Sequence, residues 1–350
     1  MGAKPVVVVT GGAGYIGSHT VRELAGRGFR PVVLDDLSEG HRAAAGPGTP
    51  LEVLDLADDA AVALAFRKHA PVEAVLHFAA SCSVPESVAK PDLYYRNNVV
   101  NSVNLLGACR DAGVKAFIFS STAATFGNPL EPLITEKHPQ SPINPYGETK
   151  LVIERALPAY ETAFGLRHVA LRYFNAAGAH PAGDLGEDHE PENHLIPLVL
   201  RAATGAAAAV TVFGTDYPTP DGTCVRDYIH VCDLATAHVL ALERLLQGGA
   251  SASFNLGNGL GYSVRDVIRE AERVTGKKIP AKEGPRRPGD PATLVASSEK
   301  IARELGWKPR FGELKDIIGT AWRWHQSHPA GYGDRKGVHG HGTSSGKAPR

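Results

Sequence analysis

The sequence has few cysteines, no long apolar run and no excess of charge, and each of these absences excludes a class of protein. The 4 cysteines among 350 residues show neither CxxC nor zinc-ligand spacing, so we expect reduced, buried thiols and no metal site. No apolar run approaches the roughly 20 residues that cross a bilayer, and no signal-peptide pattern follows Met1. The 37 basic residues balance 37 acidic ones, which leaves no basic surface for nucleic acid. We therefore expect a cytoplasmic protein with neither a membrane nor a nucleic-acid partner.

What the chain does contain is a regular alternation of short apolar runs and segments with helical periodicity. The 43% hydrophobic content is enough for a sizeable core, and the length suggests about two domains. The runs are rich in β-branched residues and nearly continuous, which is typical of strands buried on both faces. They comprise residues 5–10, 31–34, 51–54, 74–78, 116–119 and 168–173. The alternation predicts an α/β fold of Rossmann type, a doubly wound parallel sheet with ligand groups at the carboxyl ends of its strands.

The first of these runs leads directly into a glycine-rich turn, residues 11–17, with helical periodicity behind it. A glycine turn between a strand and a helix places backbone N–H groups and the helix dipole at a phosphate. The next strand ends in Asp35 and Asp36. An acidic side chain at that point accepts hydrogen bonds from an adenosine ribose and repels a 2′-phosphate. We therefore predict a bound dinucleotide, NAD rather than NADP.

The composition changes near residue 176, where Gly, Pro, Asp and His crowd a loop-rich stretch up to residue 197. Helical periodicity returns at residues 195–203, 233–246, 264–274 and 313–325, and a strand pattern at 253–256. From residue 333 almost nothing is apolar. We predict a Rossmann domain at 1–175, a smaller mixed α/β domain at 176–332 that mainly binds substrate, and a disordered tail at 333–350. His339 and His341 in that tail could form a weak metal site, but an unstructured tail is the interpretation we favour.

A tyrosine and a lysine lie one helical turn apart after Asn144 and Pro145, which are typical of an N-cap and a first helical position. Tyr146 and Lys150 would therefore share one face of a helix. A free phenol has a pKa of about 10 and is a poor base at neutral pH. A nearby cation favours the phenolate and lowers that pKa. The pair predicts a tyrosine general acid/base, beside the hydroxyl of Thr122 at the end of a strand.

With these features in place, the chain resembles the extended short-chain dehydrogenase/reductase family, and within it the nucleotide-sugar epimerases. The matching stretches are TGGAGYIGSH (10–19), HFAA (77–80), PESVAKP (85–91), YYRNN (94–98), FIFSSTAATFG (117–127), PYGETK (145–150), LRYFNAAGAHPAGDLGED (171–188), FGTDYPTPDGTCVRDYIHV (213–231) and RRPGDPA (286–292). The resemblance covers about residues 4–333. It implies tightly bound NAD, a UDP-sugar substrate, a homodimer, and the interconversion of UDP-galactose and UDP-glucose.

The resemblance also implies a role for each residue of the predicted catalytic set. Tyr146 would take the proton from the sugar 4-hydroxyl, and the hydroxyl of Thr122 would bond the same oxygen. Lys150 would hold the nicotinamide ribose and lower the pKa of Tyr146. C4 would give its hydride to NAD, and the 4-keto intermediate would turn over in the pocket. The hydride would then return to the opposite face, without net redox change.

By the same resemblance, two groups of positions match the binding sites of the family. The cofactor positions are Gly11, Gly14, Tyr15, Ile16, Gly17, Asp35, Asp36, Leu37, Ser38, Asp55, Leu56, Phe78, Ala79, Ala80, Asn97, Thr122, Tyr146, Lys150 and Phe174. The substrate positions are Thr122, Tyr146, Asn175, His194, Leu195, Arg226, Tyr228, Arg287, Asp290 and Leu294. Two arginines in the second group suit the bidentate geometry of a diphosphate.

Two departures from the family pattern leave alternatives open. Cys82 stands where some members carry a lysine near the cofactor pyrophosphate, and Leu294 where some carry an aromatic residue beside the sugar. The second departure allows a 4-epimerase of another UDP-sugar, of the UDP-N-acetylglucosamine, UDP-xylose or UDP-glucuronate type. A non-catalytic NAD-binding sensor is a more distant alternative, because a fold does not guarantee chemistry. A 4,6-dehydratase would need an Asp–Glu pair where this chain has Ala123 and Ala124.

Overall fold

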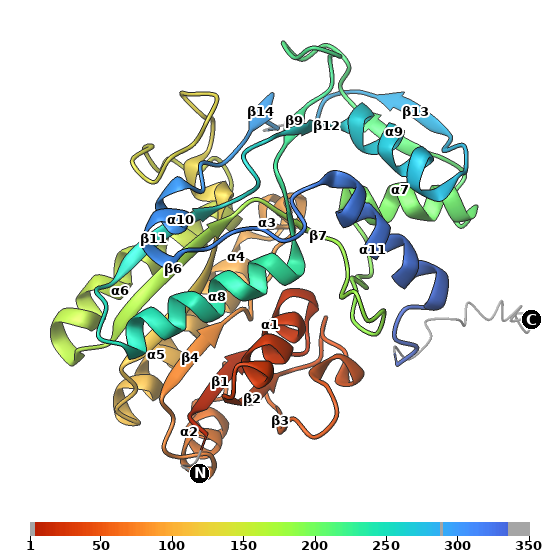
Figure 1. Ribbon diagram of the computed structural model, residues 1–350. Coiled ribbons are helices and arrows are strands. Elements are labelled where there is room, and N and C mark those ends of the chain that lie inside the picture. Colours follow the sequence, from red (N-terminus) through yellow and green to blue (C-terminus); the bar gives the residue numbers. More distant parts are fainter. Residues whose placement is uncertain (1–3, 288–289, 335–350) are drawn as a thin grey trace, which may run out of the picture.

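The largest element of the fold is a seven-stranded sheet, seen here in a computed structural model that describes residues 4–287 and 290–334 (Figure 1). Its strands are β1 (Val6–Thr10), β2 (Arg30–Asp35), β3 (Leu51–Val53), β4 (Ala74–His77), β5 (Ala116–Thr122), β6 (Arg167–Tyr173) and β11 (Ala252–Leu256). All are parallel, in the order β11-β6-β5-β4-β1-β2-β3. The order reverses at β1, so the predicted doubly wound sheet is confirmed, with its ligand crevice expected beyond β1 and β4.

Helices cover both faces of this sheet and bury two separate cores. The flanking helices are α1 (Tyr15–Gly26), α8 (Val231–Leu246) and α10 (Glu299–Leu305) on one face, and α2 (Asp59–Lys68), α5 (Asn101–Asp111) and α6 (Pro145–Phe164) on the other. Side chains alternate along a strand, so Val7 and Val9 of β1 join the core with α1 and α8. Val6 and Val8 join the core with α2, α5 and α6. This two-sided burial explains why the strands are continuous apolar runs.

The segment before β5 is helical from residue 91 to residue 111, but its hydrogen-bond pattern changes along the way. It consists of α4 (Pro91–Tyr94), a wide helical turn over Tyr95–Val100, and α5. The wide turn carries Asn98, whose side-chain amide donates to Thr149 of α6 at 3.1 Å and whose carbonyl accepts from Ser81 N at 2.9 Å. Wide turns of this kind often mark functional positions in helices. Here the turn contacts both the loop after β4, through Ser81, and helix α6, through Thr149.

A second, smaller region of helices and short strands lies beside the carboxyl ends of the sheet (Figure 1). Its helices α7 (Leu195–Thr204), α9 (Val264–Thr275) and α11 (Leu314–Ser327) share one apolar core. Its strands are β7 (Asn175–Ala177), β8 (Val210–Phe213), β9 (Val225–Arg226), β10 (Tyr228–His230), β12 (Tyr262–Ser263), β13 (Ala281–Gly284) and β14 (Thr293–Leu294). They pair as β10-β7, β12-β9-β14 and β13-β8. The mixed α/β character predicted for this region is therefore observed.

Segments after residue 176 also contribute to the large sheet and its helical layer. Strand β11 lies at the edge of that sheet beside β6, and α8 packs on α1. The remaining helical elements are α3 (Val84–Ala89) and two 3-10 turns, Arg42–Ala45 and Ala123–Phe126. The division of the chain at residue 175 stays a prediction about function. From residue 335 onward the predicted disordered tail, with His339 and His341, falls outside the described residues.

Among the residues that the structure describes, no helix is both long enough and apolar enough to cross a membrane.

Candidate active site

The predicted cofactor positions gather at one edge of the large sheet. Six of them follow or close a strand: Gly11 after β1, Asp35 in β2, Asp55 after β3, Phe78 after β4, Thr122 in β5 and Phe174 after β6. Because all these strands are parallel, their carboxyl ends meet at the same edge. The edge therefore brings together positions that lie more than a hundred residues apart in the chain.

The glycine turn after β1 is packed too tightly for side chains. Gly11 has a φ of +68°, and a Cβ there would lie 2.5 Å from the backbone nitrogen of Ala79. A Cβ on Gly17 would lie 2.1 Å from the carbonyl oxygen of Gly11. Gly14, the N-cap of α1, offers no side-chain acceptor to the first turn of the helix. The positive end of α1 and its N–H groups are thus left for an anion such as a diphosphate.

Asp35, at the end of β2, stabilises this turn by hydrogen bonds to its backbone. Its two carboxylate oxygens accept hydrogen bonds from Ala13 N and Leu37 N, both at 2.9 Å. Burial raises the pKa of Asp35, and these two backbone hydrogen bonds oppose that shift. Leu37 itself has a φ of +59°, an unusual value for a residue other than glycine. Each carboxylate oxygen keeps a second lone pair, so the ribose contact of Asp35 stays a prediction.

Helix α6 begins where the sequence predicts and carries Tyr146 to the end of β5. The Asn144 side chain accepts a hydrogen bond from Gly147 N at 2.9 Å, and Pro145 is the first helical residue. A Cβ on Gly147 would lie 2.4 Å from the carbonyl oxygen of Ala124, so only glycine permits this approach. The buried ring of Tyr146 is thereby brought within hydrogen-bond reach of the Thr122 hydroxyl. The predicted acid/base tyrosine and its hydroxyl neighbour do meet.

The electrostatics of Tyr146 differ from the sequence expectation. Burial raises its pKa well above 10, and Tyr173 and Cys82 add to the increase. The hydrogen bond from Thr122 works in the opposite direction but does not outweigh them. Lys150 is not among the largest contributions to this shift of the Tyr146 pKa. The expected lowering of the Tyr146 pKa by Lys150 is therefore not a property of the chain alone.

The surroundings of Lys150 explain this difference. Its ammonium donates to the carbonyl oxygen of Ser120 at 3.0 Å and lies 5.1 Å from the centre of the Phe119 ring. The side chain is buried, and burial lowers the pKa of Lys150 to about 8. The lysine is thus anchored on β5, one helical turn from Tyr146.

A buried ion pair, which the sequence did not reveal, holds α6 against the sheet. Glu154 of α6 pairs with Arg172 of β6 at 2.6 Å, and both side chains are less than 10% exposed. Glu154 also accepts a hydrogen bond from Ser121 of β5. These partners come from three different elements, and side-chain periodicity within one element does not indicate which residues of another element it will contact.

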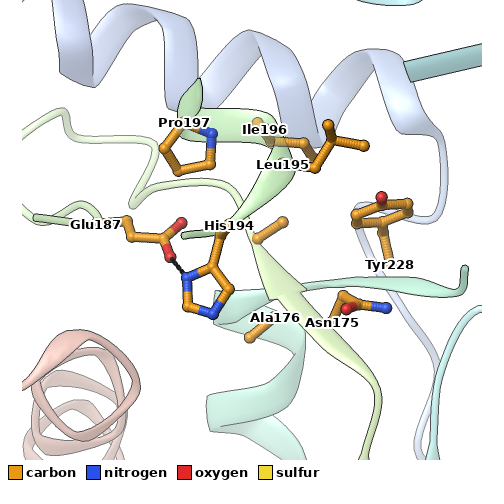
Figure 2. Close-up of a pocket in the computed structure, with 9 residues that line it drawn as sticks. Asn175, Ala176, Glu187, His194, Leu195, Ile196, Pro197 and Tyr228 are labelled. Atoms are coloured by element: carbon orange, nitrogen blue, oxygen red, sulfur yellow. Dashed lines mark ion pairs between the residues drawn. The ribbon is translucent and has the colours of Figure 1, made fainter. Parts of the chain in front are cut away.

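Four predicted substrate residues line a small cavity of about 40 Å³ beside β7 and β10 (Figure 2). They are Asn175, His194, Leu195 and Tyr228. Strands β7 and β10 pair Asn175 directly with Tyr228, and His194 caps α7. The cavity does not include Tyr146, Lys150 or Thr122. It is too small for a whole nucleotide-sugar and forms only one recess of the predicted site.

Three further substrate positions meet on the short sheet next to this cavity. Strand β14 pairs with β9 so that Leu294 lies opposite Arg226. The guanidinium of Arg226 forms an ion pair and a short hydrogen bond with Asp290. Arg287 lies with its guanidinium 4.1 Å from the centre of the Phe213 ring. The structure therefore places two cations on the same side of the molecule as the cavity residues.

Asp227 is a structural residue of this site that the sequence analysis did not identify. It is completely buried and accepts hydrogen bonds from the backbone nitrogens of Asn258, Gly259 and Ala296, at 2.7 to 3.1 Å. Its own carbonyl oxygen accepts from the side chain of Asn175 at 2.9 Å. Asp227 thus joins β9 and β10 to the segment that follows β11. Its position between Arg226 and Tyr228 in a matching stretch was the available signal.

Comparisons with known proteins agree with this geometry. Residues 7–257 match the NAD dependent epimerase/dehydratase family. A UDP-glucose 4-epimerase of Streptococcus mutans is 51% identical over 330 residues, which cover 94% of this chain and 99% of that protein. A UDP-glucose 4-epimerase of Halalkalibacterium halodurans is 52% identical over 326 residues, 93% of this chain and 97% of its own length. The crystal structure of a UDP-glucose 4-epimerase from Brucella ovis in complex with NAD has a TM-score of 0.88 and 50% identity, covering 91% of this chain and 97% of the other.

Proposed function

Because this chain belongs to the NAD dependent epimerase/dehydratase family, we propose that it interconverts UDP-galactose and UDP-glucose by reversible oxidation at C4 of the sugar. The observation that carries the proposal is the meeting of Thr122, Tyr146 and Lys150 at the carboxyl edge of the sheet. Relatives named UDP-glucose 4-epimerase match nearly the full length of the chain at about half identity, which supports this reaction over one on another UDP-sugar.

The glycine turn fits NAD. Side chains at Gly11 and Gly17 would collide with backbone, so the turn closes against β4 and presents the uncapped end of α1. That end would hold the pyrophosphate. Asp35 and Asp36 favour a ribose without a 2′-phosphate. When bound, NAD supplies the hydride acceptor and a positive charge on its oxidised ring.

The roles of the chain's own residues follow from their chemistry. Tyr146 removes the proton of the 4-hydroxyl and returns it to the same oxygen at the end of the cycle. Thr122 hydrogen-bonds that oxygen and orients it toward the phenol. Lys150, fixed on the carbonyl of Ser120, would use its remaining N–H donors to hold the cofactor ribose. The charge that turns Tyr146 into a base comes in part from the bound cofactor, because the chain alone raises the Tyr146 pKa.

The second region would bind the UDP part of the substrate. Arg226 and Arg287 suit the diphosphate, because a guanidinium forms two parallel hydrogen bonds with phosphate oxygens. Asp290 pairs with Arg226 and would hold it in position. Asn175 and His194 line the recess in this second region and would meet the sugar phosphate.

A homodimer is the assembly that we propose. Supporting it, the stretch from α4 into α5 exposes several large apolar side chains: Leu93, Tyr95, Val100 and Val103 are each more than 40% exposed. A patch of this kind is typical of a surface covered by a partner. We also propose a cytoplasmic location, which fits the free thiols of the described cysteines. Cys109, Cys224 and Cys232 are buried as expected, whereas Cys82 is exposed, so the expectation of a buried thiol was wrong there.

One experiment tests the proposal. The purified chain is denatured, the released nucleotide is identified by mass spectrometry, and the native protein is incubated with UDP-galactose. We expect NAD rather than NADP, and conversion to UDP-glucose without added cofactor. Bound NADP, or NAD without conversion of either UDP-hexose, would contradict the proposed function.

A further inference from the structure

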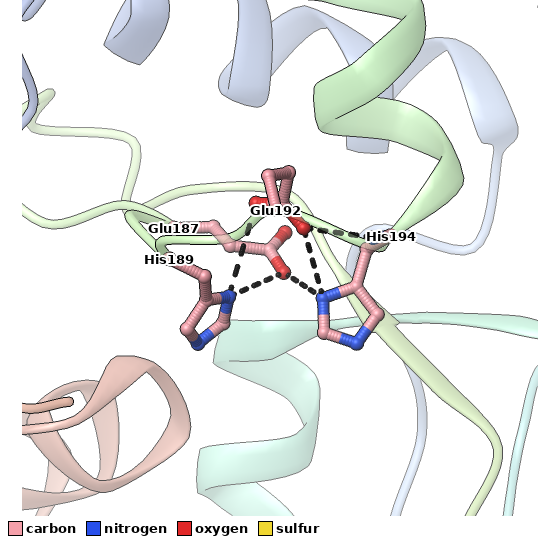
Figure 3. Close-up of side chains that lie close together, drawn as sticks. All are labelled: Glu187, His189, Glu192 and His194. Atoms are coloured by element: carbon pink, nitrogen blue, oxygen red, sulfur yellow. Dashed lines mark hydrogen bonds and ion pairs between the residues drawn. The ribbon is translucent and has the colours of Figure 1, made fainter. Parts of the chain in front are cut away.

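The segment between β7 and α7 brings two histidines and two glutamates to one point. Glu187, His189, Glu192 and His194 follow the pattern E-x-H-x-x-E-x-H, and their side chains face one another from a short loop (Figure 3). One potential ligand atom from each of the four lies within 4.8 Å of the other three. We call these four residues the His/Glu cluster. The sequence analysis missed it because it looked for metal-ligand spacing among cysteines.

The distances within the His/Glu cluster suit a four-coordinate ion. Glu187 Oε1 lies 2.6 Å from His194 Nδ1 and 3.4 Å from His189 Nδ1. Glu192 approaches His194 Nδ1 to 3.4 Å and His189 Nδ1 to 3.8 Å. Ligands about 2.0–2.1 Å from a tetrahedral zinc ion are separated by roughly 3.3 Å. The measured distances bracket that separation.

Two atoms of the cluster are buried without a hydrogen-bond partner among the described residues. They are Glu187 Oε1 and His189 Nδ1. The Glu187 side chain is only 5% exposed, so water does not replace the missing partner at low cost. The close neighbours of both atoms lie inside the cluster, where Glu187 Oε1 forms ion pairs with the Nδ1 atoms of His194 and His189. Donor atoms that point at a common centre rather than at one another are expected of metal ligands.

The charges of the His/Glu cluster also favour a bound cation. Two carboxylates with side chains 5% and 2% exposed place a charge of about −2 in a small buried volume. Backbone N–H groups of Asn193 and His194 donate to Glu192 Oε1, both at 2.7 Å, and fix that carboxylate. Glu187 Oε1 has no backbone donor of this kind in the described part of the chain, and its close neighbours are the imidazole nitrogens of His194 and His189. A divalent cation with neutral imidazoles would balance both carboxylates.

We propose that the His/Glu cluster binds a divalent transition-metal ion, with Zn²⁺ as the ion it fits best. Imidazole and carboxylate ligands in fourfold geometry suit zinc, whereas Mg²⁺ and Ca²⁺ require six or more oxygen ligands. Coordination through Nδ1 leaves the other nitrogen of His194 on the opposite side of the ring, as Figure 2 shows. The ion would therefore fix the loop between β7 and α7, and with it His194 at the cavity. The cluster shares His194 with the predicted substrate positions but contains none of Thr122, Tyr146 and Lys150, so metal binding is measured separately from activity.

The test measures metal directly. Full-length protein is purified without a histidine tag and dialysed with Zn²⁺, and its zinc content is determined by mass spectrometry. Affinity is then measured by competition with a chromophoric chelator, and Mg²⁺ and Ca²⁺ serve as comparison ions. We expect one tightly held zinc per chain, and an intense visible absorption when Co²⁺ replaces it. The cobalt spectrum is recorded on the parent protein, so it requires no substitution.

Matched variants then assign the ligands. His189→Gln removes a ligand outside the predicted substrate positions and should weaken zinc binding about tenfold or more. His325→Gln changes a neighbouring histidine that is not in the cluster and should keep parental affinity. Replacing His339 and His341 by alanine checks the tail and should also change nothing. Equal zinc binding by the parent and His189→Gln, zinc lost only with the tail histidines, or no retained zinc would each overturn the proposal. The last result would mean that a proton, not a metal, holds the cluster together.

Discussion

The two sides of the proposed site are held in different ways. At the sheet edge, Tyr146 and Lys150 are buried, and Lys150 is held by a hydrogen bond to the carbonyl of Ser120 in β5, two residues from Thr122. On the substrate side, Arg226 is held by its ion pair with Asp290, on short strands and loops. The first arrangement follows from the sheet itself, whereas the second depends on pairs of charged side chains.

This difference has a physical consequence. Buried hydrogen bonds to a sheet are insensitive to salt, whereas ion pairs that are partly exposed are screened by it. The sheet edge should therefore keep its geometry over a wide range of conditions, and the substrate side should respond to charge. Preorganised catalytic groups beside an adaptable binding surface also suit a substrate whose sugar must turn over between two half-reactions.

The largest effect should come from Tyr146→Phe, which removes only the acid/base oxygen. We expect kcat to fall about 10²- to 10⁴-fold, while the bound NAD stays at the parental level because the sheet edge is intact. Single-turnover assays and nucleotide content measure the two quantities. Activity within about tenfold of the parent, a barrier change of roughly 1.4 kcal/mol or less, would show that Tyr146 is not the base.

A smaller effect, on stability, should come from His77 at the end of β4. The Ser102 hydroxyl donates to Asn98 O at 2.6 Å, so it accepts from His77 Nε2 at 2.8 Å, and His77 Nδ1 accepts from Thr10 at 2.7 Å. The histidine is therefore neutral, and burial lowers its pKa to about 3. Between pH 6.5 and pH 3, His77 binds a proton in the unfolded chain but not in the folded chain. The free energy of unfolding therefore decreases as the pH decreases over this range.

The size of this effect can be checked by denaturant unfolding at two pH values. Going from pH 6.5 to 4.5, His77 should cost the folded state about 2–3 kcal/mol. His77→Gln should remove that part of the pH dependence. Ser102→Ala is the matched control, since it removes a partner of the ring but keeps the titrating group. An unchanged pH dependence in His77→Gln would disprove the assignment.

Gly17→Ala tests the glycine turn itself. Its Cβ would lie 2.1 Å from the Gly11 carbonyl oxygen, and overpacking of this kind costs about 1–3 kcal/mol. NAD should therefore bind roughly 5- to 150-fold more weakly. Gly26→Ala, in the same helix, meets nothing within 4 Å and should leave NAD affinity unchanged. Equal NAD affinity in both variants would mean that the turn is not the cofactor cradle.

The smallest effect should come from Asp290→Asn on the substrate side. Partly exposed ion pairs contribute about 0.2–1 kcal/mol, so KM for UDP-galactose should rise roughly 1.4- to 5-fold with little change in kcat. The increase should shrink in high salt. Asp216→Asn, which breaks the comparable pair of Asp216 with Arg286 outside the predicted site, should leave KM unchanged. A kcat loss larger than the KM change would place Asp290 in the chemistry instead.

The sequence predicted those parts of the molecule that depend on local pattern. Two-sided apolar runs identified the central strands, and Asn144 with Pro145 located the start of α6. The end of β5 was less well predicted, because its polar residues 120–122 continue the strand. The backbone of a polar residue at a strand end can pair in the sheet while its side chain faces the site. Composition alone therefore does not show whether such a residue belongs to the strand or to the loop after it.

Features that depend on contacts between distant segments could not be predicted. The pairing of Glu154 with Arg172 requires α6 to lie against β6, and no periodicity encodes that. The wide helical turn over residues 95–100 carries Asn98, which contacts two other segments. The pKa of Tyr146 was misjudged for the same reason. One-turn spacing puts Lys150 nearby, but burial and the anchoring of Lys150 on Ser120 decide the outcome.

The central claim is that bound cofactor, and not the chain alone, makes Tyr146 a base. The most direct measurement is an absorbance titration of tyrosinate in the holoenzyme, with NAD oxidised and then reduced, and with Tyr146→Phe as the reference. The oxidised ring carries a positive charge that the reduced ring lacks, and a positive charge favours the phenolate. We therefore expect a Tyr146 signal at lower pH in the oxidised holoenzyme than in the reduced one. Identical titrations of the two forms would contradict the account.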